Sequence, residues 1–406
     1  MGAMIDSTSM ISAIFWAASA LLIYELIVYP VLMRIISSSS TPAVHPEPED
    51  LPAVSLIIPA HNEQLCIQAK LENALALDYP RDKLEIVVAS DGSSDRTVEL
   101  ARKYEGETVR VLDLQPNRGK AAALNAAVAE SRGEVLCLCD ANVMFRSDSL
   151  RRMVVRLADD TVGAVSGDVR LASNESDFEI GEAIYYRVER PVQLGESRIG
   201  SMMGADGGMY LIRRELFQPL PTDTILDDFV TSMRVIQQRR RIVYEPAAIA
   251  VENGTPSWRQ EFRRRVRVMV GAVQSLKRRE WPPVARPVEM WQYASHKLLR
   301  WFGPVWLMLL LLSSILLWGE GWIFRVALLA QLATYGLAAG ATWSATLRRT
   351  RLGGISFYFA MSHVAMAAGL AKGLFARPTG VWERTERVRP ETVEGTETHL
   401  SAGARA

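Results

Sequence analysis

The chain has 406 residues, 49% hydrophobic and 22% charged, and 46 Lys and Arg balance 45 Asp and Glu to a net charge of +1. A chain this apolar can bury a core, which excludes disorder over most of its length. The balanced charge lacks the basic excess typical of nucleic-acid-binding proteins, so we expect no nucleic-acid partner. Three cysteines without zinc-type spacing disfavour a disulfide scaffold and indicate a reducing compartment. The length suggests two or three structural units.

The first apolar stretch, residues 10–36, carries a single acid, Glu25. It exceeds the roughly 20 residues that cross a bilayer, so we predict a transmembrane helix. A cleaved signal peptide is the alternative, but a positive n-region is missing and the apolar run is too long. Glu25 is either a functional carboxylate or, as we favour, a polar residue that faces other helices or an interface. Residues 37–52, rich in Ser, Pro and acids, are predicted to form a linker.

From residue 53 to 252, short apolar runs alternate with helical segments. This pattern predicts one α/β domain with a mostly parallel sheet, right-handed crossovers and helices on both faces. The stretch from 162 to 252 is less regular and ends in a further strand. The expected strands are 54–59, 84–90, 109–114 and 134–140, and the expected helices are 64–77, 95–104 and 120–131.

Basic and apolar residues mix over 256–281, which predicts an amphipathic interfacial helix with Arg toward lipid phosphates and Val, Met and Leu toward acyl chains. The apolar spans 302–318 and 322–347 predict a transmembrane hairpin with a very short turn. The last apolar stretch, 355–375, either crosses the membrane or lies on it, and a tail follows over 376–406.

Basic residues gather at the ends of these spans: Arg34 follows the first, Lys297 and Arg300 precede the second, and residues 346–354 follow the third. The positive-inside rule therefore predicts an outside N-terminus and a cytoplasmic catalytic domain in a multi-pass protein of the plasma (inner) membrane. With three crossings the tail is cytoplasmic and 355–375 is interfacial, whereas with four crossings the tail is outside.

Acidic residues follow the predicted strands: Asp91 in SDGSSD, Asp140 with Asn142 in CDAN, and the pair Asp227 and Asp228 in LDDF. Ligands of parallel α/β sheets bind at the carboxyl ends of the strands. An Asp in such a turn can hold ribose hydroxyls, and an Asp-x-Asp-like pair offers oxygen ligands for Mg²⁺ or Mn²⁺ on a diphosphate. Taken alone, an Asp at a strand-to-helix turn is more often a helix cap than a ligand-binding residue.

An ordered set of motifs is more specific than any single acid. The motifs are PAHNE (59–63), ASDGSSD (89–95), NRGKAAALNAA (117–127), CDAN (139–142), GGMYLIRR (207–214), LDDF (226–229) and EFRRRVRVMVG (261–271). As a set they resemble the family 2 glycosyltransferases, in particular the membrane-bound processive synthases of cellulose, hyaluronan, chitin and poly-N-acetylglucosamine, over roughly residues 50–390. The resemblance implies a Rossmann-like nucleotide-sugar-binding domain of the GT-A type, a UDP-sugar donor such as UDP-N-acetylglucosamine or UDP-glucose, and Mg²⁺ or Mn²⁺.

The resemblance implies that the nucleotide is bound through residues of three of these motifs. Ala60, Glu63 and Asp91 would contact the uracil and ribose, and Lys120 would lie beside the nucleotide. A lysine at the start of a helix favours an anion on general grounds as well, although a solvated surface lysine is the alternative.

The same resemblance implies the roles of the acids. Asp140 would bind the diphosphate through a divalent metal, and Asn142 stands where the family has a second Asp, so metal affinity should fall there. Asp228 aligns with the general base and Asp227 with the family's usual Glu. The implied reaction inverts the anomeric carbon while an acceptor hydroxyl gives its proton to Asp228. The alternative is that Asp227 and Asp228 are a cluster of acids at the start of a helix.

The basic segment departs from the family. Processive members carry Gln-x-x-Arg-Trp, in which Trp stacks on the acceptor sugar. Here Arg264 replaces Gln, Arg267 matches Arg and is implied to hold the diphosphate together with Arg264, and Val268 replaces Trp. Trp258 or Trp281 could supply the stacking from nearby. The tail 377–387 resembles the loop that closes over the nucleotide, and its matching positions are Trp382 and Thr385.

The sequence therefore predicts an inverting, metal-dependent hexosyltransferase that extends a polysaccharide at the membrane, with coupled export as an open option. The alternatives are transfer of one sugar to a lipid acceptor and a degenerate nucleotide-binding regulatory membrane protein. The expected partners are the UDP-sugar, a glycan or lipid acceptor and membrane lipids. Because three helices are few for a channel, export would need a homo-oligomer or export partners.

Overall fold

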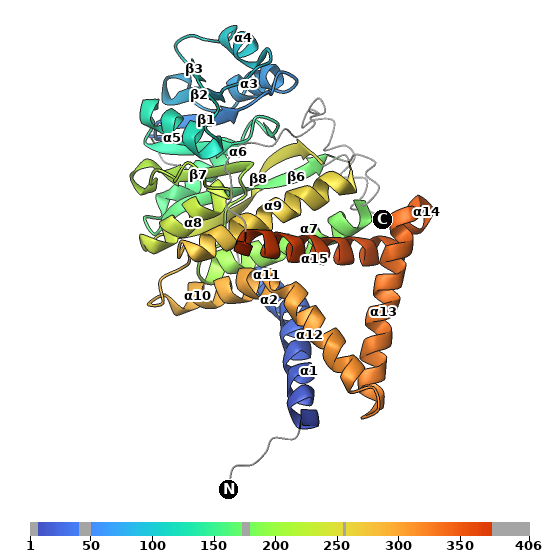
Figure 1. The fold of residues 1–406 in the computed structure, drawn as a ribbon. Helices are drawn as coiled ribbons and strands as arrows, with labels where there is room; N and C mark the ends of the chain where they lie inside the picture. The colour runs from blue at the N-terminus through green and yellow to red at the C-terminus, as the bar shows by residue number, and fades with distance from the viewer. Residues whose placement is uncertain (1–6, 40–49, 173–178, 255–256, 376–406) are drawn as a thin grey trace.

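The computed structural model describes residues 7–39, 50–172, 179–254 and 257–375 (Figure 1). Most of the predicted linker and the whole predicted closing loop, with Trp382 and Thr385, lie outside these ranges. In Figure 1 a sheet domain forms the upper part, and three long helices extend away from it at the bottom.

The domain is built on one eight-stranded sheet in the order β3-β2-β1-β4-β7-β6-β8-β5. Strands β1 to β4 pair in parallel, β7 is antiparallel to both β4 and β6, and β6 pairs with β8 in parallel. The predicted α/β class with a mostly parallel sheet is confirmed. The strands are β1 Val54–Ala60, β2 Leu84–Asp91, β3 Val109–Leu114, β4 Val135–Cys139, β5 Met144–Phe145, β6 Val162–Ala172, β7 Met209–Arg213 and β8 Arg241–Asn253.

Both faces of the sheet are covered, because alternate strand residues point to opposite sides. In β1, Leu56 and Ile58 join the core on one face and Ile57 joins the core on the other. Helices α3, α4 and α6 cover the first face, and α5, α8 and α9 cover the second. Their bounds are α3 Ile67–Leu75, α4 Thr97–Arg102, α5 Lys120–Glu130, α6 Ser149–Val155, α8 Asp227–Gln237 and α9 Trp258–Lys277.

A long helix, α7 (Glu179–Ile199), occupies part of the stretch whose sequence pattern is irregular. It buries the acids Glu182, Glu189 and Glu196, which interrupt the apolar periodicity that identifies a helix in a sequence. Gly195 lets α7 approach the N-terminal helix closely, since a Cβ there would lie 2.5 Å from the carbonyl oxygen of Met33.

The N-terminal helix is continuous from Ser7 to Ser39, in three parts: α1 (Ser7–Ile23), a π-helical turn η1 (Tyr24–Val28) and α2 (Tyr29–Ser39). Its first part packs against α12 (Gly303–Leu316), and its last part packs against α7 of the sheet domain. The same helix therefore contacts both the apolar helices and the domain.

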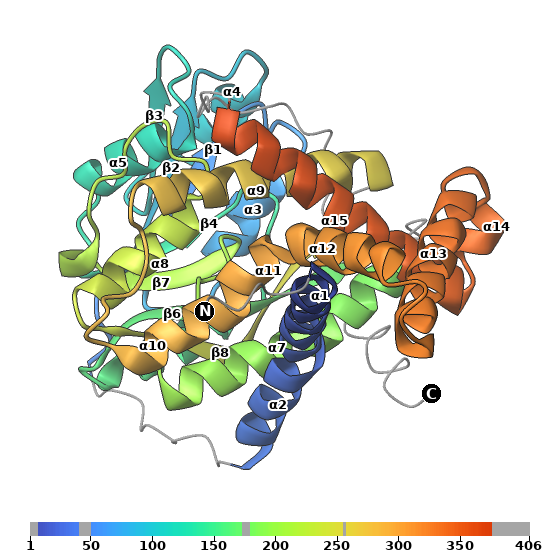
Figure 2. The same cartoon turned by 60° about the horizontal axis from the view of Figure 1, so that its bottom comes forward.

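The chain leaves the domain through α10 (Pro287–Tyr293), the π-helical turn η5 (Ala294–Leu298) and α11 (Leu299–Trp301), and then bends by 60° into α12. Helices α13 (Trp322–Trp343) and α14 (Ala345–Arg348) follow. By length and composition, three described helices could cross a membrane, or four if the bent pair counts as one span. Figure 2 shows α1 and α12 side by side.

The third of these candidates, α15 (Arg351–Phe375), packs along α9 of the domain (Figure 1). Glycines permit the close contact, because a Cβ on Gly369 would lie 2.6 Å from Cβ of Met269 and one on Gly373 would lie 2.8 Å from Cβ of Val273. Met269 is 1% exposed and Val273 3% exposed. The prediction that the Val and Met side chains of this basic helix face acyl chains is therefore wrong for these two residues, because protein covers them.

Candidate active site

One lysine joins three elements that are far apart in the sequence. Lys120 begins α5, and its ammonium lies 2.9 Å from Oδ1 of Asp140 at the end of β4 and 3.1 Å from Oδ2 of Asp227 at the start of α8. Burial alone would lower the pKa of Lys120, but Asp140, Asp227 and Asp228 together raise it well above its ordinary value. A charged lysine thus neutralises the acids at the carboxyl end of the sheet, and the surface-lysine alternative does not hold.

Asp228 lies next to this cluster. Its Oδ1 accepts a hydrogen bond of 2.7 Å from the backbone amide of Phe229, and burial, reinforced by Asp227, raises its pKa to about 7. Gly207 makes room for the other oxygen, since a Cβ there would lie 2.8 Å from Oδ2. A carboxylate with a pKa near neutrality can accept a proton from a hydroxyl during reaction.

The cation site suggested by CDAN has an unusual donor set. Among the described residues, no three His, Cys, Asp or Glu side chains gather as a metal site. Asn142 is nevertheless buried, and its Oδ1 has no hydrogen-bond partner within the described chain. This orphaned oxygen, two residues from the Asp140 carboxylate, fits a hard divalent cation whose other ligands are diphosphate or water oxygens.

Asp91 is buried and holds the loop before α5. Its two carboxylate oxygens accept backbone hydrogen bonds from Arg118 (2.8 Å) and Gly119 (2.7 Å). Gly92 must be a glycine, because its φ is +64° and a Cβ would lie 2.5 Å from the amide nitrogen of Asn117. Asp91 therefore fixes the turn that directly precedes Lys120. A contact between Asp91 and a nucleotide stays a prediction.

The PAHNE segment forms the neighbouring turn. Asn62 adopts a φ of +56° and accepts a hydrogen bond of 2.8 Å from the amide of Ser94, while Nδ1 of His61 lies 2.7 Å from the carbonyl oxygen of Asp91. Ala60 and Glu63 are both buried beneath these turns. The structure thus brings the first two motifs together, and base recognition by Ala60 and Glu63 remains untested.

Asp206 was not among the predicted residues. It precedes Gly207, its Oδ1 accepts a hydrogen bond of 2.9 Å from the amide of Gly208, and its amide binds Oγ of Ser166. Burial raises the pKa of Asp206 to about 6, and the charge of Asp140 contributes. The sequence did contain a sign of it, an Asp followed by two glycines immediately before a buried strand.

The two predicted arginines of α9 have different surroundings. Arg264 makes a bidentate ion pair with the buried Glu261, at 2.7 and 2.9 Å, and Glu261 also accepts from Arg265. The charge of Arg264 acts on Asp206, so this end of α9 is electrostatically coupled to the acidic site. Arg267 is exposed, and none of its contacts with the described residues places it at the site.

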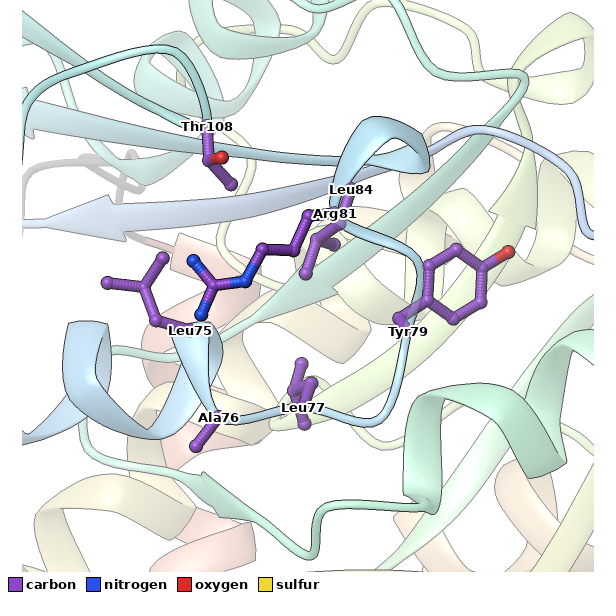
Figure 3. A pocket seen from close by; sticks show the side chains of 7 residues that line it. All are labelled: Leu75, Ala76, Leu77, Tyr79, Arg81, Leu84 and Thr108. Atoms are coloured by element: carbon purple, nitrogen blue, oxygen red, sulfur yellow. The ribbon is translucent and has the colours of Figure 1, made fainter.

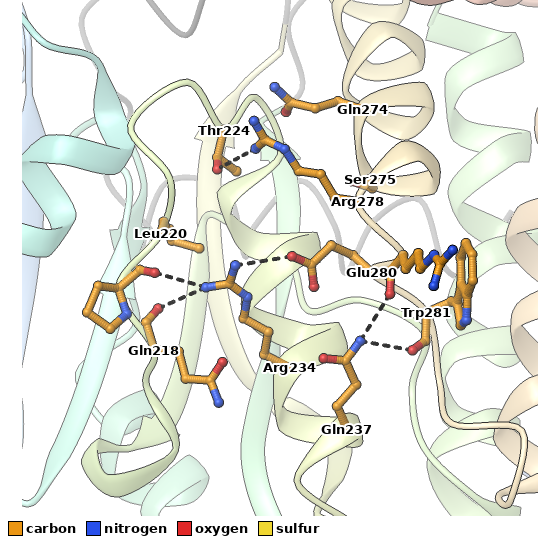
Figure 4. A network of polar contacts seen from close by, with 12 residues as sticks. Gln218, Leu220, Thr224, Arg234, Gln237, Gln274, Ser275, Arg278, Glu280 and Trp281 are labelled. Atoms are coloured by element: carbon orange, nitrogen blue, oxygen red, sulfur yellow. Dashed lines mark hydrogen bonds and ion pairs between the residues drawn. The ribbon is translucent and has the colours of Figure 1, made fainter.

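No contact among the described residues places Trp258 or Trp281, the two residues proposed for stacking, beside the acids of the site. Trp258 packs edge to face on Phe357 of α15, with ring centroids 5.7 Å apart. The carbonyl of Trp281 accepts a hydrogen bond of 3.1 Å from Gln237 (Figure 4). Both side chains also pack against apolar clusters of the described chain, which favours a packing role for each.

The contacts drawn in Figure 4 hold the far end of α8. Arg234 donates to Glu280 at 3.1 Å and to the carbonyl of Pro219 at 2.9 Å, and Arg278 donates to Thr224 at 3.3 Å. They anchor α8 against the C-terminal end of α9. Because α8 starts with Asp227 and Asp228, this anchoring fixes the position of both acids.

A pocket of about 290 Å³ lies elsewhere, around Leu75 at the end of α3 and Leu84 at the start of β2 (Figure 3). Parallel sheets of this kind bind ligands at the opposite, carboxyl ends of the strands. Its side chains are mostly apolar, and we assign it no role in the chemistry.

The comparisons with known proteins agree with this geometry. Residues 55–220 match the family model described as Glycosyl transferase family 2. A protein of Bacillus subtilis, "Probable glycosyltransferase YdaM", is 32% identical over 232 residues, which are 54% of this chain and 55% of that protein. A "Poly-beta-1,6-N-acetyl-D-glucosamine synthase" of Staphylococcus aureus is 30% identical over 207 residues, half of each chain. This chain thus spans about half the length of these curated relatives.

One solved structure is similar over nearly the whole chain. "Mannosyltransferase PcManGT from Pyrobaculum calidifontis in complex with GDP-Man and Mn2+" has a TM-score of 0.69 and 26% identity, and the match covers 90% of this chain and 99% of that one. The family match, the mixed sheet and the acids at its carboxyl edge all support an enzyme and disfavour a degenerate regulatory protein. The chain therefore contains a family 2 glycosyltransferase domain with the GT-A fold.

Proposed function

We propose that this protein is an inverting hexosyltransferase that moves a sugar from a UDP-sugar to an acceptor at the cytoplasmic face of the inner membrane and extends a polysaccharide. The carrying observation is the Lys120 cluster, in which one ammonium lies within 3.1 Å of both Asp140 and Asp227 and beside Asp228. The ammonium of Lys120, the carboxylates of Asp140 and Asp227, and Asp228 with a pKa of about 7 thus lie at one edge of the sheet, which supports these roles.

In this proposal each residue has one task. Asp140 and Asn142 hold a divalent cation, which when bound supplies positive charge to the diphosphate leaving group. Lys120 shifts from the carboxylates to the diphosphate and stabilises the charge that develops as the bond to the sugar breaks. Asp228 accepts the proton of the acceptor hydroxyl that attacks from the opposite face of the sugar. Asp227 orients Lys120.

The membrane placement is supported by exposed apolar side chains on α1, α12 and α13, which project from the domain (Figure 1). Such faces suit lipid. Because α15 packs along α9 of the domain, we propose that it lies at the interface and that α1, α12 and α13 form three crossings. The exposed residues include Ile14 and Trp16 on α1, Ile27 on η1, Met308 and Leu312 on α12, and Val326 and Leu329 on α13.

A second candidate is transfer of one mannose or related hexose from a GDP-sugar. A solved structure of a mannosyltransferase in complex with GDP-Man favours this candidate. The match covers 99% of that structure's chain, whereas the matches to the curated relatives cover about half of their length. The substitution of Val268 for the stacking Trp is also easier to reconcile with a single addition than with a growing chain.

A donor screen separates these candidates. Purified protein in membranes is given radiolabelled UDP-N-acetylglucosamine, UDP-glucose or GDP-mannose with Mn²⁺ or Mg²⁺, and the products are sized. We expect nucleotide release and a polymeric product with a UDP-sugar. A single-sugar lipid product rejects the polymerase, release from the GDP-sugar alone rejects the UDP donor, and no release from folded protein with any donor rejects a transferase of these donors.

A further inference from the structure

Lys297 is a cation that the proposed chemistry does not use. It belongs to η5, the turn through which the chain passes from the domain toward α12. Its Cε and Nζ lie 3.9 and 4.0 Å from the point that a Cβ on Gly204 would occupy, and the ring of Phe229 lies 3.3 Å from the same point. Since Phe229 follows Asp228, the ammonium lies close to the start of α8.

The carboxylates around Lys297 are engaged with other groups. Glu189 binds Nε2 of His296 at 2.8 Å and Arg300 at 2.9 Å, and Glu196 binds Nδ1 of His296 at 2.8 Å and Tyr29 at 2.6 Å. Within the described ranges no carboxylate pairs with Lys297 within 4.0 Å, although Glu189, Glu196 and Asp228 all act on its charge. The ammonium is half-buried, the cation of Arg300 lies near it as well as these carboxylates, and the described residues give it no hydrogen-bond or ion-pair partner.

The turn that carries Lys297 is firmly held. Gln292 accepts a hydrogen bond of 3.1 Å from the amide of Ser201 and donates one of 3.0 Å to the carbonyl of Glu196. Both ring nitrogens of the buried His296 contact carboxylates and hold the π-helical turn that also carries Lys297. Because the backbone of this turn is fixed, binding of an anion by Lys297 has to order only the lysine side chain.

The position also distinguishes Lys297 from Lys120. Lys120 contacts Asp227 from α5, on the side of β4 and Asn142, where the diphosphate is proposed to bind. Lys297 approaches the neighbourhood of Asp228 from η5, which leads directly into the apolar helices (Figure 2). Two cations on two elements suit two separate anions, and the second must arrive from the membrane side.

We propose that Lys297 binds the phosphate of an acceptor whose hydroxyl reaches Asp228 from the membrane side. This inference rests on the proposed function and adds the class of the acceptor that receives the first sugar, a phosphate-bearing alcohol. An ammonium is a compact point charge that binds phosphate through charge-assisted hydrogen bonds. A lipid headgroup and a soluble glycerol phosphate offer the same chemistry.

The competing explanation is that Lys297 merely balances the charges of Glu189 and Glu196. A balancing role predicts that loss of the charge destabilises the protein and that phosphate binding does not depend on it. An acceptor role predicts a selective loss of phosphate binding with the melting temperature retained.

The first arm measures binding without turnover. Protein in phosphatidylcholine nanodiscs is titrated with glycerol 1-phosphate by calorimetry, and parallel discs contain phosphatidylglycerol. We expect Lys297→Gln to weaken phosphate binding about tenfold or more and Lys297→Arg to restore most of it. Arg263→Gln, which removes an exposed charge on α9, is the matched control and should bind as wild type does.

The second arm uses whichever donor the wild type accepts. Lys297→Gln should raise the KM for the acceptor about tenfold or more and leave the KM for the nucleotide sugar near the wild-type value. If activity depends on phosphatidylglycerol and glycerol phosphate does not compete, the acceptor is a lipid headgroup. If glycerol phosphate competes and phosphatidylglycerol is not needed, the acceptor is soluble.

Three results would overturn the assignment. The first is phosphate binding and an acceptor KM that do not change in Lys297→Gln, and the second is a neutral glycan as the acceptor of the first sugar in both kinds of disc. The third is a melting temperature that falls in Lys297→Gln and is restored by arginine without any change in phosphate affinity. A wild type that turns over no donor rejects the proposed function, and the binding arm still decides the role of Lys297.

Discussion

The two polar clusters of this protein are built in opposite ways. At the carboxyl edge of the sheet, Lys120 and Asp227 stand at the first positions of α5 and α8, Asp140 directly follows β4, and in the proposed mechanism their charges become available to a ligand. On the membrane side, Glu196 and His296 lie inside helices and are completely paired with buried neighbours. We expect the first cluster to take part in the reaction and the second to hold α2, α7 and η5 together. Substitutions in the first should change rates, and those in the second should change stability.

The largest effect is expected at Asp228. In Asp228→Asn, transfer should fall about 10²–10⁴-fold, because the amide cannot accept the acceptor proton. Nucleotide affinity, measured by calorimetry, should stay near wild type. Asp160→Asn removes an exposed acid far from the site and serves as the control. An Asp228→Asn enzyme with full activity would remove Asp228 as the base.

Glu196→Ala should have the largest effect on stability. It removes the acceptor of Tyr29 and of His296 in a buried network, and breaking such a pair typically destabilises by about 3–5 kcal/mol. Denaturant unfolding in detergent measures the change. Glu99→Ala breaks an exposed ion pair with Arg96 and should leave stability near that of the wild type. Equal effects of the two substitutions would contradict the structural role of the buried cluster.

Contact between α9 and α15 can be tested with two glycines. Gly369→Ala places a methyl group 2.6 Å from Cβ of Met269 and should destabilise the protein by about 1–3 kcal/mol. Gly336→Ala in α13 meets nothing within 4 Å and should be neutral or stabilising by about 0.5–1 kcal/mol. If both variants melt alike, α15 does not pack on α9 in the membrane.

Lys120→Ala should change two affinities in opposite directions. Without nucleotide, Mn²⁺ binding should become tighter, because the ammonium no longer competes for Asp140. Nucleotide-sugar affinity should fall about tenfold, the effect expected when a charge-assisted hydrogen bond to phosphate is lost. Electron paramagnetic resonance of free and bound Mn²⁺ measures the first affinity and calorimetry the second. Affinities that fall together would mean that Lys120 does not exclude the metal.

The smallest expected effect concerns pH. Asp228 must be ionised to accept a proton, and its pKa is about 7, so transfer should rise with pH below 7 and level off above it. Asp206 raises the pKa of Asp228, so Asp206→Asn should move the midpoint of the profile to lower pH. A rate that falls as pH rises through this range would contradict the assigned protonation state.

The sequence by itself determined the βα units and the order in which their acids appear. β1, β2, β3 and β4 lie within one or two residues of the predicted ranges, because local periodicity and turn residues depend on near neighbours. Since parallel strands end at one edge, Asp91, Asp140 and Lys120 could be assigned to a common site before any coordinates were known.

Tertiary structure alone decided what depends on distant partners. The buried acids of α7 gave no periodic apolar pattern. One of them, Glu189, can be buried because it accepts hydrogen bonds from His296 and Arg300, which lie about a hundred residues later in the sequence. The hydropathy of α15 is consistent with a span, and the glycines that fit it onto α9 acquire meaning only beside Met269 and Val273. Asp206 and Lys297 likewise gain their roles from the side chains that surround Asp228. Non-local burial and charge pairing, which no local pattern records, set these positions.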